Sequence, residues 1–373
     1  MKLYWYLIPS DGPFPWRPEG RRTVDYGYLR QLAGAIDQVG FEGALVAGGG
    51  AGHDLWTLSS FLAAHTQKMK FIIAQHPGQT SPLVMAQKAA TFDQLSNGRL
   101  IINVVNGGET VGPQHGVFLG HDERYEMADE YWGLWSRIIQ GENVTHEGKY
   151  FRVRGAQLQL RSRQPGRPEL HFGGSSPAAV RVAAKLVDTY LTYGEPPPEA
   201  ALKIAEVGRA ASALGRKLEY GVRLHVIVRE TRKEAWEAAQ WLYERIDRET
   251  VEATRRMTRA AGATSQDRMN ALNAGPLPKD ARGLEIYPDL WSGIGLTRAG
   301  NAVAIVGDPE TVARRIRDYE SHGFGTFILS GYPLIEEAYR FADLVMPLLR
   351  EKTASPGLSF SRAPELAESS QSS

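Results

Sequence analysis

Short apolar runs alternate with amphipathic stretches along almost the whole chain, and this alternation constrains the fold more than any other feature. The runs are rich in Val, Ile, Phe and Tyr, as expected for strands that are buried on both faces of a parallel sheet. The candidate strands are Leu3–Ile8, Gly43–Val46, Lys70–Gln75, Leu100–Val105, Glu169–Gly173, Thr189–Thr192, Tyr220–Val228 and Thr326–Ser330. Because helical patterns separate them, we expect parallel strands joined by helical crossovers.

Eight strands of this kind predict an α/β fold, a (β/α)₈ TIM barrel whose active site lies at the C-terminal ends of the strands. A doubly wound open sheet is the alternative. The helix signals agree with either arrangement. Val24–Val39 stops at Gly40, which suits a left-handed terminal residue, and Pro82–Leu95 begins with proline in its first turn. Asp308 followed by Pro309 predicts another helix start.

Two segments interrupt this rhythm. Residues 107–123 are predicted to form a long polar loop. Residues 247–300 contain a highly charged helix, Arg248–Met257, and the Gly/Pro-rich run Gly275–Pro278, so we expect an insertion that acts as a lid over the strand ends. We assign residues 1–350 to a single domain and expect residues 353–373, which are rich in serine, to be disordered.

Charge and cysteine content exclude several classes of function. The chain has 43 Lys+Arg against 42 Asp+Glu, which offers no footprint for nucleic acid and no polybasic membrane anchor. It has no cysteine, so disulfides, thiolate metal sites and cysteine nucleophiles are impossible. The apolar N-terminus suits a first strand better than a signal peptide, and no apolar stretch is long enough to cross a bilayer. We therefore expect a cytoplasmic protein.

Common catalytic signatures are missing or fail on spacing. The glycine-rich run from Val46 to His53 resembles a dinucleotide-binding loop, but His53 occupies the position of the third glycine. The sequence has no P-loop and no G-x-S-x-G elbow, and its nine histidines lack metal-ligand spacing. We therefore predict no metal site.

Polar residues gather at the predicted ends of strands. Arg223 and His225 lie two apart on one strand, so both side chains face the same way, and we favour the barrel interior over the polar face of an edge strand. Gly174, Ser175 and Ser176 lead into a helix start that suits a phosphate, although a plain helix cap explains the serines slightly better when they are taken alone.

Three further residues have weaker support. Asn103 lies near a strand end, where its amide could contact a heterocycle or cap a turn. Arg298 ends the predicted lid, and Tyr332 follows the last strand. Taken alone, Arg298 would be an ordinary surface arginine and Tyr332 an ordinary half-buried tyrosine.

Together these segments resemble the bacterial luciferase-like flavin monooxygenases, and most closely the alkanesulfonate monooxygenases. The similarity runs from about Leu3 to Leu349. Its most specific pieces are Ala90–Arg99, Glu123–Glu126, Phe172–Ser176, Gly194–Pro197, Arg223–Glu230 and Leu329–Pro333.

The resemblance implies a two-component enzyme that uses FMNH2, supplied by a separate NAD(P)H-dependent FMN reductase, together with O2. It would cleave the carbon–sulfur bond of an organosulfonate to give sulfite and an aldehyde. It also implies a homo-oligomer, either a dimer or a tetramer.

The resemblance assigns roles to the residues as well. Arg223, His225, Arg298 and Tyr332 would be the catalytic residues around the sulfonate, and His225 could transfer a proton near neutral pH. Arginine suits a permanently anionic group because it keeps its charge when partly buried. The cofactor-binding residues would be Asn103 at the flavin ring, with Tyr125, Gly174, Ser175 and Ser176 at its phosphate.

The chain departs from typical alkanesulfonate enzymes in the walls of the predicted pocket. Gly52 replaces a cysteine, Tyr193 a tryptophan, His76 an arginine and Leu334 a histidine, and Asp11–Arg17 replaces a His-Gly-Asp-Gly-His run. We therefore predict a sugar sulfonate or another bulky sulfonate as substrate, with Trp16, His53 and Tyr193 shaping its site.

Three alternatives stay open at this point. The same fold could oxidise a sulfone, an alkane or an amine. It could also serve a deazaflavin-dependent oxidoreductase, or a non-catalytic flavin-binding protein.

Overall fold

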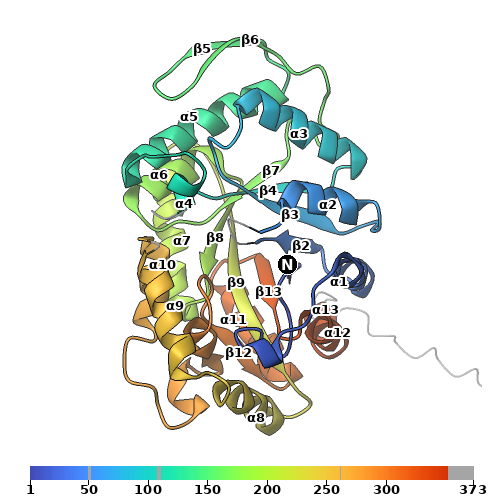
Figure 1. Cartoon of the computed structure of the whole chain (residues 1–373), viewed down its shortest axis with the longest axis vertical. Coiled ribbons are helices and arrows are strands. Elements are labelled where there is room, and N and C mark those ends of the chain that lie inside the picture. Colours follow the sequence, from blue (N-terminus) through green and yellow to red (C-terminus); the bar gives the residue numbers. More distant parts are fainter. Residues whose placement is uncertain (49–51, 107–110, 261, 352–373) are drawn as a thin grey trace, which may run out of the picture.

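The computed structural model describes residues 1–48, 52–106, 111–260 and 262–351 (Figure 1). Eight parallel strands form a closed barrel, which excludes the doubly wound open sheet. They are β1 (Lys2–Leu7), β2 (Gly43–Val46), β3 (Lys70–Gln75), β4 (Leu100–Val104), β7 (Glu169–Phe172), β8 (Thr189–Tyr193), β9 (Glu219–Val228) and β13 (Thr326–Ser330). The predicted (β/α)₈ barrel is confirmed, and each of its strands matches a candidate from the sequence.

Strand β9 closes the barrel and also extends beyond it. Its first residues pair with β8 on one side and β13 on the other, so β9 is an internal strand and not an edge strand. Its last four residues, His225–Val228, pair with β12 (Ala304–Gly307). Two short antiparallel strands, β10 (Glu285–Tyr287) and β11 (Leu290–Trp291), continue the sheet outward from β12. The sequence did not predict these three strands.

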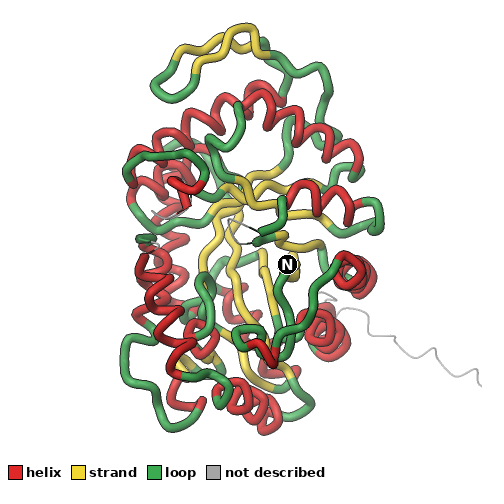
Figure 2. The backbone as a smooth tube through the Cα atoms, viewed as in Figure 1, coloured by secondary structure: helices red, strands yellow, loops and turns green. Residues whose placement is uncertain are grey.

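Helices lie outside the strands (Figure 2). They are α1 (Tyr26–Val39), α2 (Leu55–Ala63), α3 (Pro82–Leu95), α4 (Val111–Gln114), α5 (His121–Ile139), α6 (Pro177–Leu186), α7 (Pro197–Ser212), α8 (Arg232–Tyr243), α9 (Arg248–Ala260), α10 (Thr264–Ala271), α11 (Pro309–Ser321), α12 (Leu334–Leu344) and α13 (Met346–Glu351). Short 3₁₀ helices cover Pro18–Gly20, Ala281–Leu284 and Gly293–Leu296. Among the described residues, none of these helices is long and apolar enough to cross a membrane.

The predicted helix boundaries have physical causes that the structure displays. Asp308 caps α11 by accepting a hydrogen bond from the Thr311 amide at 2.8 Å. Gly40 ends α1 with φ of 103°, a left-handed conformation that favours glycine. Helix α1 begins at Tyr26, two residues later than expected, because Asp25 caps it.

The segments that the sequence predicted to be irregular are only partly so in the structure. The predicted loop at 107–123 was wrong for residues 111–114, which form α4, and for residues 121–123, where α5 already begins, whereas residues 115–120 lie outside helices and strands as expected. Residues 107–110 and the tail at 353–373 lie outside the described residues, as do residues 49–51 of the glycine-rich run. An unpredicted hairpin, β5 (Val144–Glu147) and β6 (Arg152–Ala156), projects beyond α5 at the top of Figure 1.

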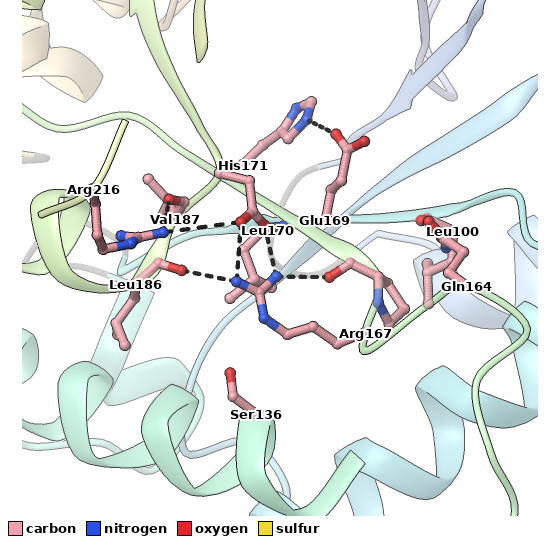
Figure 3. Close-up of polar contacts among 12 residues, drawn as sticks. Leu100, Ser136, Gln164, Arg167, Glu169, Leu170, His171, Leu186, Val187 and Arg216 are labelled. Carbon is pink, nitrogen blue, oxygen red and sulfur yellow. Dashed lines mark hydrogen bonds and ion pairs between the residues drawn. The ribbon is translucent and has the colours of Figure 1, made fainter. Parts of the chain in front are cut away.

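A half-buried network of ion pairs and hydrogen bonds fixes the N-terminal ends of two barrel strands (Figure 3). The Asp188 carboxylate accepts from the guanidinium of Arg167 at 2.6 Å and from the backbone amide of Leu170 at 2.8 Å. Arg216 donates to the carbonyl of Val187 at 2.6 Å. These contacts hold β7 and β8 in register, so the opposite ends of the same strands are set firmly at the mouth of the barrel.

Candidate active site

Two arginines, an imidazole and a phenol from separate parts of the chain meet at the barrel mouth. Arg223 and His225 project from β9, and Tyr332 follows β13. Arg298, which follows the 3₁₀ helix Gly293–Leu296, donates to the Tyr332 hydroxyl at 3.1 Å and to Ser330 Oγ at 3.3 Å. The rings of His225 and Tyr332 lie with their centroids 5.0 Å apart. The structure therefore brings together the four residues that the sequence singled out as catalytic.

Aromatic rings flank the two guanidinium groups. The Arg223 guanidinium carbon lies 5.1 Å from the ring centroid of Tyr6 and 5.3 Å from that of Tyr193. Arg223 also donates a hydrogen bond to the Tyr6 hydroxyl. The Arg298 guanidinium carbon is 5.7 Å from the Tyr6 centroid. Such contacts stabilise a cation without neutralising it. Within the described residues, neither arginine forms an ion pair with a carboxylate, so the cluster carries uncompensated positive charge.

The surroundings set the protonation states of the cluster. Burial, reinforced by the charge of Arg298, lowers the pKa of Arg223 to about 9, so this arginine stays protonated at neutral pH. The same two causes lower the pKa of His225 well below its ordinary value. His225 is therefore neutral at pH 7, which corrects the expectation that it exchanges a proton near neutral pH.

Two adjoining cavities open at this end of the barrel. One has a volume of about 270 Å³ and the other about 620 Å³, and Arg223 and Ala299 line both. Arg298 lines the larger one. His225 and Tyr332 line neither, but they contact Ser330 and Arg298 respectively. Together the cavities have the size of sites that hold a cofactor and a small substrate.

The smaller cavity has the features of an anion site at one end. Ser176 caps α6 by accepting from the Ala179 amide at 3.2 Å, so its predicted capping role is real, and the helix N-terminus favours negative charge. Ser175 Oγ lies 3.3 Å from Ser265 Oγ. A side chain at Gly174 would bring its Cβ to 2.7 Å from that of Ala179, so only glycine fits there. All five predicted cofactor residues line this cavity, which are Asn103, Tyr125, Gly174, Ser175 and Ser176.

Two further residues of this cavity escaped the sequence-based prediction. Arg124 on α5 is only 5% exposed, and its guanidinium donates to the Leu119 carbonyl at 3.0 Å. Its Nε has no partner among the described residues, and neither has the side-chain amide of Asn106. Unpaired buried donors are costly, so they point to a ligand that supplies acceptors. The signal available for Arg124 was its place beside Tyr125 in one of the specific segments.

Comparison with known proteins identifies the family. The family model of luciferase-like monooxygenases matches residues 9–326. The chain belongs to this family. Solved structures with the same fold include a riboflavin lyase with modified FMN and its substrate riboflavin, at TM-score 0.76 and 21% identity over 95% of this chain and 92% of that chain. A long-chain alkane monooxygenase matches with a TM-score of 0.76 and 20% identity, over 97% of this chain and 94% of that chain. EDTA monooxygenase from Chelativorans sp. BNC1 matches with a TM-score of 0.73 and 20% identity, over 95% of both chains.

In this luciferase-like monooxygenase, the predicted substrate residues do not share one location. His53 lines the larger cavity and Tyr193 the smaller one. Trp16 lines neither. Its indole N–H donates to the Arg245 carbonyl at 2.8 Å, and its ring lies edge-on to Tyr332 with centroids 6.0 Å apart. Trp16 therefore contacts Tyr332 of the four-residue cluster but lines neither cavity.

Two departures from the alkanesulfonate pattern contact one another in this family member. The carboxylate of Asp11, which is fully buried, accepts from the backbone amide of Leu334 at 2.9 Å. The indole of Trp5 donates to the Leu334 carbonyl at 3.0 Å. Both contacts hold the segment that carries Tyr332.

Part of the 247–300 insertion covers the smaller cavity, because residues 262–266, which precede and begin α10, line it. The insertion is tied to the barrel by Glu195, whose carboxylate meets Arg268 at 2.8 Å and Lys203 at 2.6 Å. This position suits a lid, whose movement stays a prediction. The described residues contain no group of three or more potential His, Asp or Glu metal ligands.

Proposed function

We propose that this chain is a two-component FMNH2-dependent monooxygenase that cleaves the carbon–sulfur bond of an organosulfonate. In the balanced reaction, a sulfonate R–CH₂–SO₃⁻, O2 and FMNH2 give the aldehyde R–CHO, hydrogen sulfite, FMN and water. The observation that carries the proposal is the pair of guanidinium groups, Arg223 and Arg298, which line the cavities and form no ion pair with a carboxylate among the described residues. A permanently charged sulfonate supplies the missing anion.

The smaller cavity fits a flavin mononucleotide. The phosphate would be held at the N-terminus of α6 by Arg124, Tyr125, Ser175 and Ser176. It would supply an acceptor for the Arg124 Nε, which has no partner among the described residues. Asn103 would contact the edge of the ring system. When bound, the reduced flavin supplies the two electrons that the reaction of O2 requires. A riboflavin lyase of the same fold, solved with modified FMN, supports this choice.

The chain's own residues would bind, orient and shield the substrate. Arg223 and Arg298 would hold two sulfonate oxygens and keep stabilising the charge as sulfite leaves. Tyr6 and Tyr193 flank the Arg223 guanidinium and limit its movement. Residues 262–266 would exclude water from the cavity.

Substrate size and partners follow from the same site. Gly52 and His53 line the larger cavity, where they leave room for a sugar sulfonate or another bulky sulfonate. Because the chain lacks a nicotinamide fingerprint, an NAD(P)H-dependent FMN reductase would provide the reduced flavin in the cytoplasm. We also propose a homo-oligomer.

The test measures sulfite, aldehyde and O2 uptake with FMN, NADH and a flavin reductase, across a panel of alkanesulfonates and sulfosugars. Equal amounts of sulfite and substrate-dependent O2 uptake are expected, and Arg298→Ala should abolish both. Substrate-dependent O2 uptake without sulfite would favour oxidation of a sulfone, alkane or amine. With a reduced deazaflavin in place of the FMN system, substrate reduction without O2 uptake would favour a deazaflavin enzyme. A coenzyme F420-dependent tetrahydromethanopterin reductase shares this fold.

A further inference from the structure

Ser330 connects the charged arginine to the neutral imidazole. It ends β13, where it is directly opposite His225 in the parallel register with β9, and it is fully buried. Its Oγ lies 3.0 Å from His225 Nδ1 and 3.3 Å from Arg298 Nη2. No role was assigned to this serine from the sequence.

The hydrogen-bond chemistry of the three groups fixes their directions. A guanidinium can only donate, so Ser330 Oγ accepts from Arg298. The serine's own proton then needs an acceptor, and His225 Nδ1 is the one that the described residues place within reach. Burial and the charge of Arg298 hold the pKa of His225 well below its ordinary value, so the ring is neutral and carries a single proton. If Nδ1 accepts, that proton is on Nε2.

The opposite assignment is unfavourable. If Nδ1 carried the proton and donated it to Ser330, the serine hydroxyl would be left without an acceptor in a fully buried position. Either tautomer leaves Nε2 without a partner among the described residues, but the opposite one also leaves the serine proton without an acceptor, which should disfavour it by roughly tenfold or more. Tyr332, which faces the same ring, already receives a hydrogen bond from Arg298 Nη1.

We propose that Ser330 is a positioning residue that fixes His225 as the Nε2–H tautomer and holds Arg298 beside Tyr332. The buried Nε2, which has no partner among the described residues, is then a donor and not a base. The proposal rests on the proposed function and deepens it. A cluster that has only hydrogen-bond donors left to offer recognises a head group that has only acceptors, as a sulfonate does.

Nuclear magnetic resonance of ¹⁵N-histidine-labelled full-length protein tests the proposal without flavin or substrate, so its outcome is separate from the sulfite assay. Protonated and bare ring nitrogens have well-separated resonances, and His225→Gln identifies the signals of His225 among the nine histidines. The native protein should show an unprotonated Nδ1 and a protonated Nε2 for His225. Ser330→Ala should lose this preference and show averaged signals, whereas Ser330→Thr, which keeps the hydroxyl, should retain it.

Ser59→Ala is the matched control, because it removes a fully buried hydroxyl on α2 that lies outside the cluster. It should leave the His225 signals unchanged. A protonated Nδ1 in the native protein would overturn the proposal even if Ser330→Ala does not fold. An unchanged tautomer in folded Ser330→Ala would overturn it equally.

Discussion

Replacing Arg223 by methionine should make the flavin-free protein more stable, although it removes a group of the candidate site. The reason is that Arg223, a charged and largely desolvated arginine, lies close to a second cation, Arg298, and has no carboxylate partner among the described residues. The folded state therefore disfavours the charge of Arg223, and a neutral side chain of similar length removes that penalty.

The magnitude follows from the lowered pKa. A fall from 12.5 to about 9 corresponds to about 5 kcal/mol, at about 1.4 kcal/mol per tenfold change in proton affinity. The lost contacts with the rings of Tyr6 and Tyr193 and with the Tyr6 hydroxyl offset about 2–4 kcal/mol of this gain. We expect a net gain of about 1–3 kcal/mol, or roughly 2–5 °C in Tm. A base whose pKa is lower in the folded state costs stability at every pH below that folded value, so the gain should persist through neutral pH.

Thermal unfolding followed by circular dichroism measures this effect in the flavin-free protein. Arg99→Met is the matched control, because Arg99 is also buried but its guanidinium donates to Ser96, Thr66, Met69 and Ala63. That control should lower Tm. Methanesulfonate should raise the Tm of the native protein and leave Arg223→Met unaffected. A lower Tm for Arg223→Met, or an undiminished response to methanesulfonate, would refute the reasoning.

Three other changes probe the cofactor site, the pH response and the insertion. Arg124→Leu should weaken the binding of FMN by about 10–100-fold but leave the binding of riboflavin unaffected, because only FMN has a phosphate. Fluorescence titrations measure both affinities, and equal losses for the two flavins would contradict the assignment. Burial, with the charge of His115, lowers the pKa of His76 to about 4. Stability should therefore fall as the pH drops from about 6.5 to 4, because only the unfolded state binds that proton, and His76→Gln should flatten this loss in urea titrations. Glu195→Gln should lower stability by about 3 kcal/mol and speed hydrogen exchange in α10, because it weakens the contact with Arg268. Unchanged exchange in α10 would show that Glu195 does not hold the insertion against the barrel.

The barrel was predictable because its strands are buried on both faces and therefore read as apolar runs. The hairpin β5–β6 lacks that signal, since most of its side chains are exposed and polar. Strand β12 was missed for another reason. It lies outside the barrel. It forms because β9 continues past the barrel, so that the last residues of β9 can pair with another strand.

The site was predictable where its residues are close in sequence or share a strand. Arg223 and His225 follow from the two-residue period of β9, and Ser175 and Ser176 from the start of α6. Arg124 could not be placed in the same way, because its distance from the serines depends on how α5 packs against α6. The pKa of His225 likewise depends on Arg298, which lies 73 positions further along the chain.

A crystal structure of the protein with FMN and methanesulfonate tests the central claim most directly. The account predicts the phosphate at Ser175, Ser176 and Arg124, and the sulfonate between the guanidinium groups of Arg223 and Arg298. A phosphate bound elsewhere, or a sulfonate away from both arginines at full occupancy, would contradict it.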